Sequence, residues 1–247
     1  MAEPRTIGIL GAGAWGTALA QVTARAGNRV LLWSRNAETV RSIAEDRRSP
    51  HLAAVDLDPA IAATGDLAEA ASCAIVVLAT PAQTTREVTA AAAPSIAPDT
   101  PAVITAKGIE RSSGRLLSDV VAETITHARI AVLSGPGFAG EVARGLPTAV
   151  TIATLDAALA DLLADVFAAP GFRPYASDDV RGVQIGGALK NVLAIAAGIV
   201  KGRDLGASAH AALTTRALAE MIRLGVADGG RRETLTGLSG LGDLLLT

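Results

Sequence analysis

The chain has 247 residues, half of them hydrophobic, and a net charge of -2 at neutral pH. This length suits one large domain or two moderate ones, and the charge argues against a general affinity for nucleic acid or an anionic membrane surface. Cys73 is the only cysteine, which excludes an internal disulfide. We see neither a signal peptide nor an uninterrupted apolar run of about 18–20 residues, so we expect a cytoplasmic protein without membrane insertion.

Short apolar segments alternate with helical patterns along the first 176 residues. The expected strands are residues 6–10, 29–33, 74–79, 102–105, 129–133, 147–152 and 172–175. Helices are expected between them, for example at 17–26 and 35–48. Because parallel strands that are buried on both faces are continuously apolar, the pattern predicts an α/β fold with a Rossmann-like, doubly wound parallel sheet.

The remainder of the chain has only helical patterns, at residues 180–200, 207–224 and 235–246. We therefore expect a dinucleotide-binding domain at residues 1–176 and an all-helical second domain at 177–247. The chain ends in an apolar run at 242–247, where exposed polar residues are usual. This ending leads us to expect an incomplete second domain.

Residues 11–16, Gly-Ala-Gly-Ala-Trp-Gly, stand between an expected strand and an expected helix. In the Gly-x-Gly-x-x-Gly pattern, Gly11 permits a tight turn, Gly13 lets a pyrophosphate approach the backbone, and Gly16 permits close helix–strand packing. The helix start adds free N–H groups and positive partial charge for the phosphates. We predict a dinucleotide site here, against the alternative of a glycine-rich turn without a ligand.

The end of the second expected strand bears on the choice of dinucleotide. A carboxylate there would hold the ribose 2′-hydroxyl of NAD, but the chain has Trp33-Ser34-Arg35-Asn36. Arg35 could pair with a 2′-phosphate or stack on adenine. The expected cofactor is therefore NADP or NAD, with a tilt toward NADP. The alternative is that Arg35 is a surface residue without a role.

Lys190 is one of only three lysines, with Lys107 and Lys201, and it lies in a stretch of small and apolar residues. A buried ammonium is costly unless it meets an anion or loses its proton, so Lys190 is a candidate acid–base group. Lys107 follows an expected strand, at the sheet edge where open parallel sheets bind ligands. Gly186 and Gly187, one turn before Lys190, are expected to leave space for a small substrate.

Six short segments carry a more specific pattern than the glycine loop alone. They are residues 11–20, 106–110, 133–139, 186–192, 215–221 and 237–244. Together, and in this order, they resemble NAD(P)-dependent glycerol-3-phosphate dehydrogenase of the bacterial soluble type. The resemblance implies reversible reduction of dihydroxyacetone phosphate to sn-glycerol 3-phosphate with NAD(P)H, which supplies glycerophospholipid synthesis.

The resemblance also implies roles for individual residues. Lys190 matches the catalytic lysine, which exchanges the proton of the substrate hydroxyl, and Asp243 is expected to orient it. The expected cofactor-binding residues are Gly11, Gly13, Ala14, Trp15, Gly16, Arg35, His51, Lys107 and Ala139. The expected substrate-binding residues are Lys107, Gly135, Gly137, Lys190, Asn191, Asp243 and Thr247.

The chain departs from the family pattern in three places, one of which is the loop at residues 202–208, where the asparagine common in the family is absent. His51-Leu52-Ala53-Ala54 stands where the family usually has Tyr-Leu-Pro-Gly. The family also continues past the position of Thr247 with an arginine that holds the substrate phosphate, so we expect a C-terminally truncated chain.

Two other functions stay open. One is a beta-hydroxyacid dehydrogenase, which also joins a dinucleotide domain to a helical domain bearing a lysine. The other is a nucleotide-binding module that no longer catalyses. A homodimer is the expected assembly, and no metal is expected.

Overall fold

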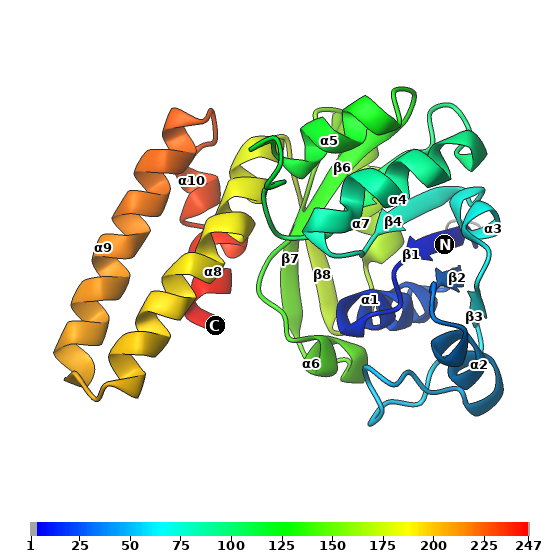
Figure 1. Cartoon of the computed structure of the whole chain (residues 1–247), viewed down its shortest axis with the longest axis horizontal. Coiled ribbons are helices and arrows are strands. Elements are labelled where there is room, and N and C mark those ends of the chain that lie inside the picture. Colours follow the sequence, from blue (N-terminus) through cyan, green and yellow to red (C-terminus); the bar gives the residue numbers. More distant parts are fainter. Residues whose placement is uncertain (1–3, 247) are drawn as a thin grey trace.

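The computed structural model describes residues 4–246, and in them eight strands form one sheet (Figure 1). The strands are β1 Thr6–Leu10, β2 Arg29–Trp33, β3 Ile61–Thr64, β4 Ile75–Leu78, β5 Pro101–Ile104, β6 Arg129–Ser134, β7 Thr148–Ala153 and β8 Phe172–Ser177. Their order in the sheet is β3-β2-β1-β4-β5-β6-β7-β8. The chain therefore reverses its direction of travel across the sheet between β1 and β4, where doubly wound folds bind their ligands.

Helices cover both faces of the sheet because successive strand residues point to opposite sides. The helices are α1 Ala14–Arg25, α2 Ala37–Asp46, α3 Leu67–Ala71, α4 Thr85–Ala92, α5 Leu117–Thr124, α6 Ala139–Arg144, α7 Ala157–Phe167, α8 Val180–Gly202, α9 Gly206–Ala227, α10 Arg232–Leu235 and α11 Asp243–Leu246. Val77 of β4 joins the cluster packed by α1 and α7, whereas Val76 and Leu78 join the one packed by α3, α4 and α5. The Rossmann-like prediction is confirmed.

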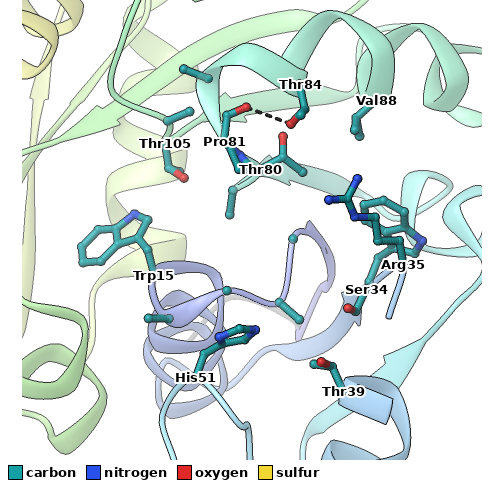
Figure 2. A pocket seen from close by; sticks show the side chains of 18 of the residues that line it. Trp15, Ser34, Arg35, Thr39, His51, Thr80, Pro81, Thr84, Val88 and Thr105 are labelled. Atoms are coloured by element: carbon teal, nitrogen blue, oxygen red, sulfur yellow. Dashed lines mark hydrogen bonds between the residues drawn. The ribbon is translucent and has the colours of Figure 1, made fainter. Parts of the chain in front are cut away.

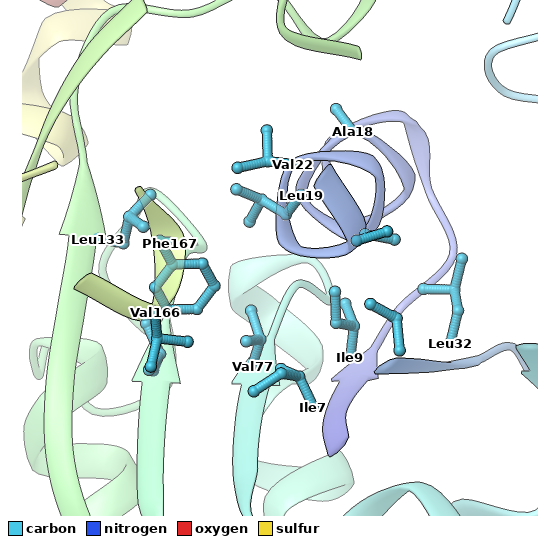
Figure 3. Packing of buried hydrophobic residues seen from close by; sticks show 14 of the residues in the cluster. Ile7, Ile9, Ala18, Leu19, Val22, Leu32, Val77, Leu133, Val166 and Phe167 are labelled. Atoms are coloured by element: carbon cyan, nitrogen blue, oxygen red, sulfur yellow. The ribbon is translucent and has the colours of Figure 1, made fainter. Parts of the chain in front are cut away.

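Phe167 at the end of α7 is the largest fully buried side chain in the described residues. Its ring lies among Val77, Leu133 and Leu19 in the layer between α1 and the sheet (Figure 3). Removing a buried phenylalanine ring costs about 3–5 kcal/mol. This packing fixes α1, and therefore the glycine loop at its start, against the sheet.

Two features of the sheet differ from the sequence expectation. Strand β3 was not predicted, because Ile61 is the only large apolar residue in its four-residue segment. Strand β7 pairs antiparallel with β6, although a wholly parallel sheet was expected. The segment between β6 and β7 turns back at one end of the sheet, where Arg25 of α1 donates to the Val142 and Ala143 carbonyl oxygens of α6.

Helices α8 and α9 pack against each other as an antiparallel pair that projects from the sheet region (Figure 1). Ile185 of α8, Ile222 of α9 and Leu235 of α10 form a separate buried cluster with Leu116. Strand β8 ends at Ser177 and α8 begins at Val180. We retain the division at residues 176 and 177 as a proposal, since it falls at this change from strand to helix.

Helix α8 contains no uninterrupted apolar run of about 18–20 residues, as expected, because Lys190 and Asn191 divide it. By length and composition it is the one helix among the described residues that could cross a membrane. Glycine and polar residues interrupt the apolar run, but the mean hydropathy of the helix stays in the range of membrane-spanning helices. Its first half packs beside β6.

Candidate active site

A cleft with a volume of about 1100 Å³ lies where the chain reverses between β1 and β4. It is lined by the segments that follow β1, β2, β4 and β5, together with the segment before α6. Trp15 stands at one end of the cleft and Arg35 at the other, with His51 between them (Figure 2). The cleft is thus long enough to take an extended ligand along the carboxyl edge of the sheet.

The glycine loop forms the floor of this cleft at the start of α1. Gly11, Gly13, Ala14 and Trp15 all line it. Gly13 is the N-cap residue of α1 and makes no side-chain cap, so the first N–H groups of the helix are turned toward the cleft. Backbone donors and the positive end of a helix form a site for phosphate.

Gly16 does not line the cleft but holds the loop against its own helix. A Cβ atom at Gly16 would lie 1.9 Å from the Gly11 carbonyl oxygen. We expect Gly16→Ala to displace the loop and weaken NADPH binding by about 100-fold, because overpacking costs about 1–3 kcal/mol or more.

This loss can be followed by tryptophan fluorescence, since both Trp15 and Trp33 line the cleft. Gly198→Ala is the control, because a Cβ at that exposed helical position meets nothing within 4 Å. Normal NADPH affinity in Gly16→Ala would contradict the packing argument.

The opposite end of the cleft contains no carboxylate from the segment after β2. Ser34, Arg35 and Asn36 line it there, and Asn36 caps α2 by accepting hydrogen bonds from the Glu38 and Thr39 N–H groups at 2.8 and 3.2 Å. The cap fixes the turn that presents Arg35. The Arg35 guanidinium therefore lies at the end of the cleft where the sequence predicts the ribose of the dinucleotide.

His51 reaches the cleft from the segment that follows α2. Its backbone N–H donates to Ser49 Oγ at 3.3 Å, and Ser49 Oγ lies 3.3 Å from Thr17 Oγ1 of α1. The segment is thereby tied to the helix that carries the glycine loop. Despite its departure from the family pattern, His51 lies in the cleft wall.

Lys190, Asp243 and Lys107 meet beyond the Trp15 end of the cleft. Lys190 Nζ donates to Asp243 Oδ1 at 2.9 Å, and Lys107 Nζ donates to Asp243 Oδ2 and, at 3.1 Å, to the Gly135 carbonyl oxygen. Lys190 is 7% exposed and Asp243 is 1% exposed, whereas Lys107 also lines the cleft. A carboxylate from α11 thus joins a lysine of the sheet region to a lysine of α8.

The electrostatics of this cluster favour an anionic ligand. Two ammonium groups facing one carboxylate leave an excess of positive charge, and burial strengthens its field. Burial lowers the pKa of Lys107, the Asp243 carboxylate opposes that effect, and the Lys190 charge adds to the lowering. The sequence predicts that Asp243 orients Lys190. It does not predict that the same carboxylate also binds Lys107.

Gly186 and Gly187 do not leave the space for a substrate that the sequence suggested. A Cβ at Gly187 would lie 2.8 Å from Ser134 Oγ, and one at Gly186 would lie 2.9 Å from the Ser239 carbonyl oxygen. Protein atoms already occupy both places. Gly187 instead lets α8 approach β6, and Gly186 lets it approach residues 238–242, which lead directly to Asp243.

The other expected site residues fall into three groups. Gly137 and Ala139 line the cleft, together with Lys107. Asn191 follows Lys190 on α8 and is exposed, and Thr247 lies outside the described residues. The sequence analysis missed several lining residues that follow strand ends or precede α6, namely Thr80, Thr105 and Phe138. The available signal was position at the carboxyl ends of expected strands, since Thr80 follows one directly, Thr105 ends one, and Phe138 lies in the glycine-rich loop after a third.

Glu110, three residues after Lys107, is held by an arginine fork. Arg86 Nε and Nη2 each donate to Glu110 at 2.9 Å, and Ser113 Oγ donates to it at 2.5 Å. The Arg86 hydrogen bonds, with Ser113 next, lower the pKa of Glu110 to about 2.

A depressed carboxylate pKa stabilises the fold above the usual value of 4.5, and this contribution is lost as pH falls toward about 2. We therefore expect the parent to have a larger free energy of unfolding in urea than Glu110→Gln, and this difference should become smaller below pH 4.5. A gap that stays constant with pH would contradict this assignment.

Family models for NAD-dependent glycerol-3-phosphate dehydrogenase match most of the chain. The N-terminal model covers residues 6–160 and the C-terminal model covers residues 179–247. The chain belongs to this family. The site described above therefore lies across the two parts that the glycerol-3-phosphate dehydrogenase family models recognise.

Individual relatives agree with this family assignment. Glycerol-3-phosphate dehydrogenase [NAD(P)+] of a Bradyrhizobium species is 58% identical over 243 residues, which are 98% of this chain and 74% of the relative. The protein of that name from Parvibaculum lavamentivorans is 54% identical, over 98% of this chain and 73% of its own length. The chain thus spans about three quarters of these relatives.

A solved structure shows the same fold. The crystal structure of glycerol-3-phosphate dehydrogenase from Coxiella burnetii superimposes with a TM-score of 0.94 at 41% identity, covering 98% of this chain and 75% of that one. The yeast glycerol-3-phosphate dehydrogenase structure gives a TM-score of 0.87 at 26% identity, over 99% and 77% of the two chains.

Proposed function

We propose that this chain reversibly reduces dihydroxyacetone phosphate to sn-glycerol 3-phosphate with NADPH or NADH, and so supplies glycerophospholipid synthesis. Family membership supports the reaction, and the placement of Lys190 supports the site. Lys190 is buried beside a carboxylate at the Trp15 end of a dinucleotide-sized cleft. That juxtaposition of proton donor and cofactor cleft is the observation that carries the proposal.

The residues present fit a nicotinamide dinucleotide. A helix start with a glycine loop suits the pyrophosphate, and the cleft continues from Trp15 to Arg35. When bound, the cofactor supplies the hydride. Gly11, Gly13, Ala14, Trp15 and the segment at Ala139 would hold it. Gly16 would act through the shape of the loop.

Lys190 is proposed to handle the proton at the substrate oxygen. During reduction the carbonyl oxygen gains negative charge, which an ammonium stabilises before donating its proton. During oxidation the neutral amine takes the hydroxyl proton back. Asp243 holds this amine in place, and Lys107 offers positive charge for the substrate's phosphate. Gly135, Gly137, Asn191 and Thr247 are proposed as further substrate contacts.

Arg35 is proposed to favour NADPH over NADH. Its guanidinium could pair with the 2′-phosphate, which only NADPH carries. We expect Arg35→Ala to weaken NADPH binding by about 10-fold and NADH binding by less than twofold, since a charged hydrogen bond is worth about 1.5–3 kcal/mol. Arg41→Ala, an exposed arginine on α2, is the control. Equal losses for the two cofactors would remove the 2′-phosphate argument.

Turnover tests the reaction itself. NADPH oxidation should require dihydroxyacetone phosphate and should not occur with β-keto acids. Turnover with keto acids alone would favour the beta-hydroxyacid dehydrogenase. Tight NADPH binding with no turnover on either substrate would favour a non-catalytic nucleotide-binding module.

We also propose a cytoplasmic location and a homodimer. Helix α8 carries buried Lys190, which a membrane-spanning helix would have to place in lipid away from Asp243. Val192, Ile195 and Ile199 are exposed along α8, which supports a contact between subunits. Light scattering of the purified protein would give its mass directly, and a monomer at micromolar concentration would remove the dimer proposal.

A further inference from the structure

Residues 107–111, the segment that carries Lys107, are held by the start of α4 and the turn before it. Gln83 Nε2 donates to the Ile109 carbonyl oxygen at 2.9 Å, and Gln83 Oε1 accepts from the Arg111 N–H group at 3.0 Å. One turn later, the Arg86 guanidinium grips Glu110 with two hydrogen bonds of 2.9 Å. Four bonds thus join the two segments.

The same stretch of chain forms part of the cleft wall. Ala82, Thr84, Glu87 and Val88 line the cleft, and Figure 2 shows Thr84 and Val88 on the side away from His51. Gln83 and Arg86 alternate with them and face the Lys107 segment. Residues 82–88, the turn before α4 and the first turn of α4, therefore contribute both to the wall of the cofactor cleft and to the support of the Lys107 segment.

We propose that Gln83, Arg86 and Glu110 are positioning residues that fix the Lys107 ammonium between Asp243 and the cleft. The proposal rests on the role given to Lys107 in the proposed function. None of the three needs to touch substrate or cofactor. They act by holding the backbone from which Lys107 extends.

The geometry of the fork explains why it can set a position. Two parallel bonds from a planar guanidinium to a carboxylate fix orientation as well as distance. Glu110 is 6% exposed and the Arg86 side chain is 38% exposed, so the carboxylate side of the fork is buried while the guanidinium reaches solvent. A displacement of about 1 Å at a positioning group can cost about 10²-fold in rate. Losing the fork should therefore misplace Lys107 while leaving the glycine loop unchanged.

Kinetics with Glu110→Gln and Gln83→Ala test this proposal. We expect kcat/KM for dihydroxyacetone phosphate to fall about 10- to 100-fold, mostly through KM, while NADPH affinity, read from tryptophan fluorescence, changes less than threefold. The kcat/KM of Arg86→Lys should lie between those of the parent and Arg86→Gln, because lysine keeps the positive charge but cannot form the two parallel hydrogen bonds. Thermal unfolding of each variant separates lost folding from lost positioning.

Glu123→Gln is the matched control. Glu123 accepts a hydrogen bond of 2.7 Å from Arg86 Nη1, so this variant also removes a partner of Arg86. It leaves the Lys107 segment held, and its kinetics should match the parent within twofold. Equal effects of Glu110→Gln and Glu123→Gln would overturn the proposal, as would full kcat/KM in Gln83→Ala and Glu110→Gln.

Lysine labelling gives a readout that does not depend on turnover. The chain has only three lysines, so an amine-reactive ester followed by mass spectrometry reports each one. We expect Lys107 in Glu110→Gln to label at least threefold faster relative to Lys201, because its ammonium leaves a buried pair. If the wild-type enzyme shows no turnover but Lys107 still labels faster in Glu110→Gln, the proposed function is refuted and the positioning role is not. Unaltered Lys107 labelling in the folded variant would refute the positioning role.

Discussion

Replacing Lys190 with alanine is expected to lower kcat by about 10³-fold or more while NADPH still binds. General acid–base catalysis contributes about 10²- to 10⁴-fold, and loss of the charge beside the developing alkoxide adds to that. Lys190 lies outside the residues that line the dinucleotide cleft, so the binding of NADPH should change less than threefold. Stopped-flow turnover and fluorescence titration measure the two quantities separately.

The chain supplies a matched control for this experiment. Lys201 lies on the same helix, eleven residues further on, and is exposed. Lys201→Ala should leave turnover unchanged. Lys190→Met, which keeps most of the side-chain volume, distinguishes the missing ammonium from a packing defect, and it should be as inactive as Lys190→Ala. An unchanged rate in either Lys190 variant would remove the lysine from the mechanism.

The parts of this fold that follow from local patterns were predictable from the sequence. The run at β4 is continuously apolar because both faces of that strand are covered, and the glycine loop has its spacing because the turn and the helix packing require it. The missed elements have weak local patterns. Ile61–Thr64 forms β3 through its pairing with β2, and nothing in the local pattern of β7 distinguishes an antiparallel from a parallel partner.

The sequence singled out several residues that the structure brings together, but not the connections between them. The scarcity of lysine singled out Lys107 and Lys190, yet nothing in the spacing of residues 107, 190 and 243 indicates that one carboxylate serves both amines. In the sequence, Glu110 stands out only as the last residue of the 106–110 segment, and Arg86 is not singled out, because a charged residue in a loop or on a helix is usually solvated. Contacts between residues distant in the sequence are set by packing, so the structure is needed to find them.

Asp243 should be the most sensitive position in the molecule for stability. Its carboxylate is 1% exposed and bonds both Lys190 and Lys107. We expect Asp243→Asn to lower the free energy of unfolding by about 3–5 kcal/mol, because it leaves buried ammonium groups without their anion. Urea unfolding at pH 7 measures the loss. Asp228→Asn, which breaks an exposed pair with Arg181, should cost at most about 1 kcal/mol.

The pH dependence of the stability of Asp243→Asn tests the direction in which Asp243 shifts the pKa of Lys107. Asp243 raises the pKa of Lys107 against the effect of burial, so the asparagine variant should have a still lower Lys107 pKa. In the variant, the unfolded chain therefore binds more protons than the folded chain over a wider pH range than in the parent. The free energy of unfolding rises with pH across that range. The stability deficit of Asp243→Asn should accordingly narrow as pH rises through the range between the lowered Lys107 pKa of the variant and that of the parent, below the ordinary value of 10.5. Adding Lys107→Met to Asp243→Asn removes one of the unpaired amines and should recover part of the lost stability at pH 7. A double variant no more stable than Asp243→Asn would show that unpaired charge is not the cause.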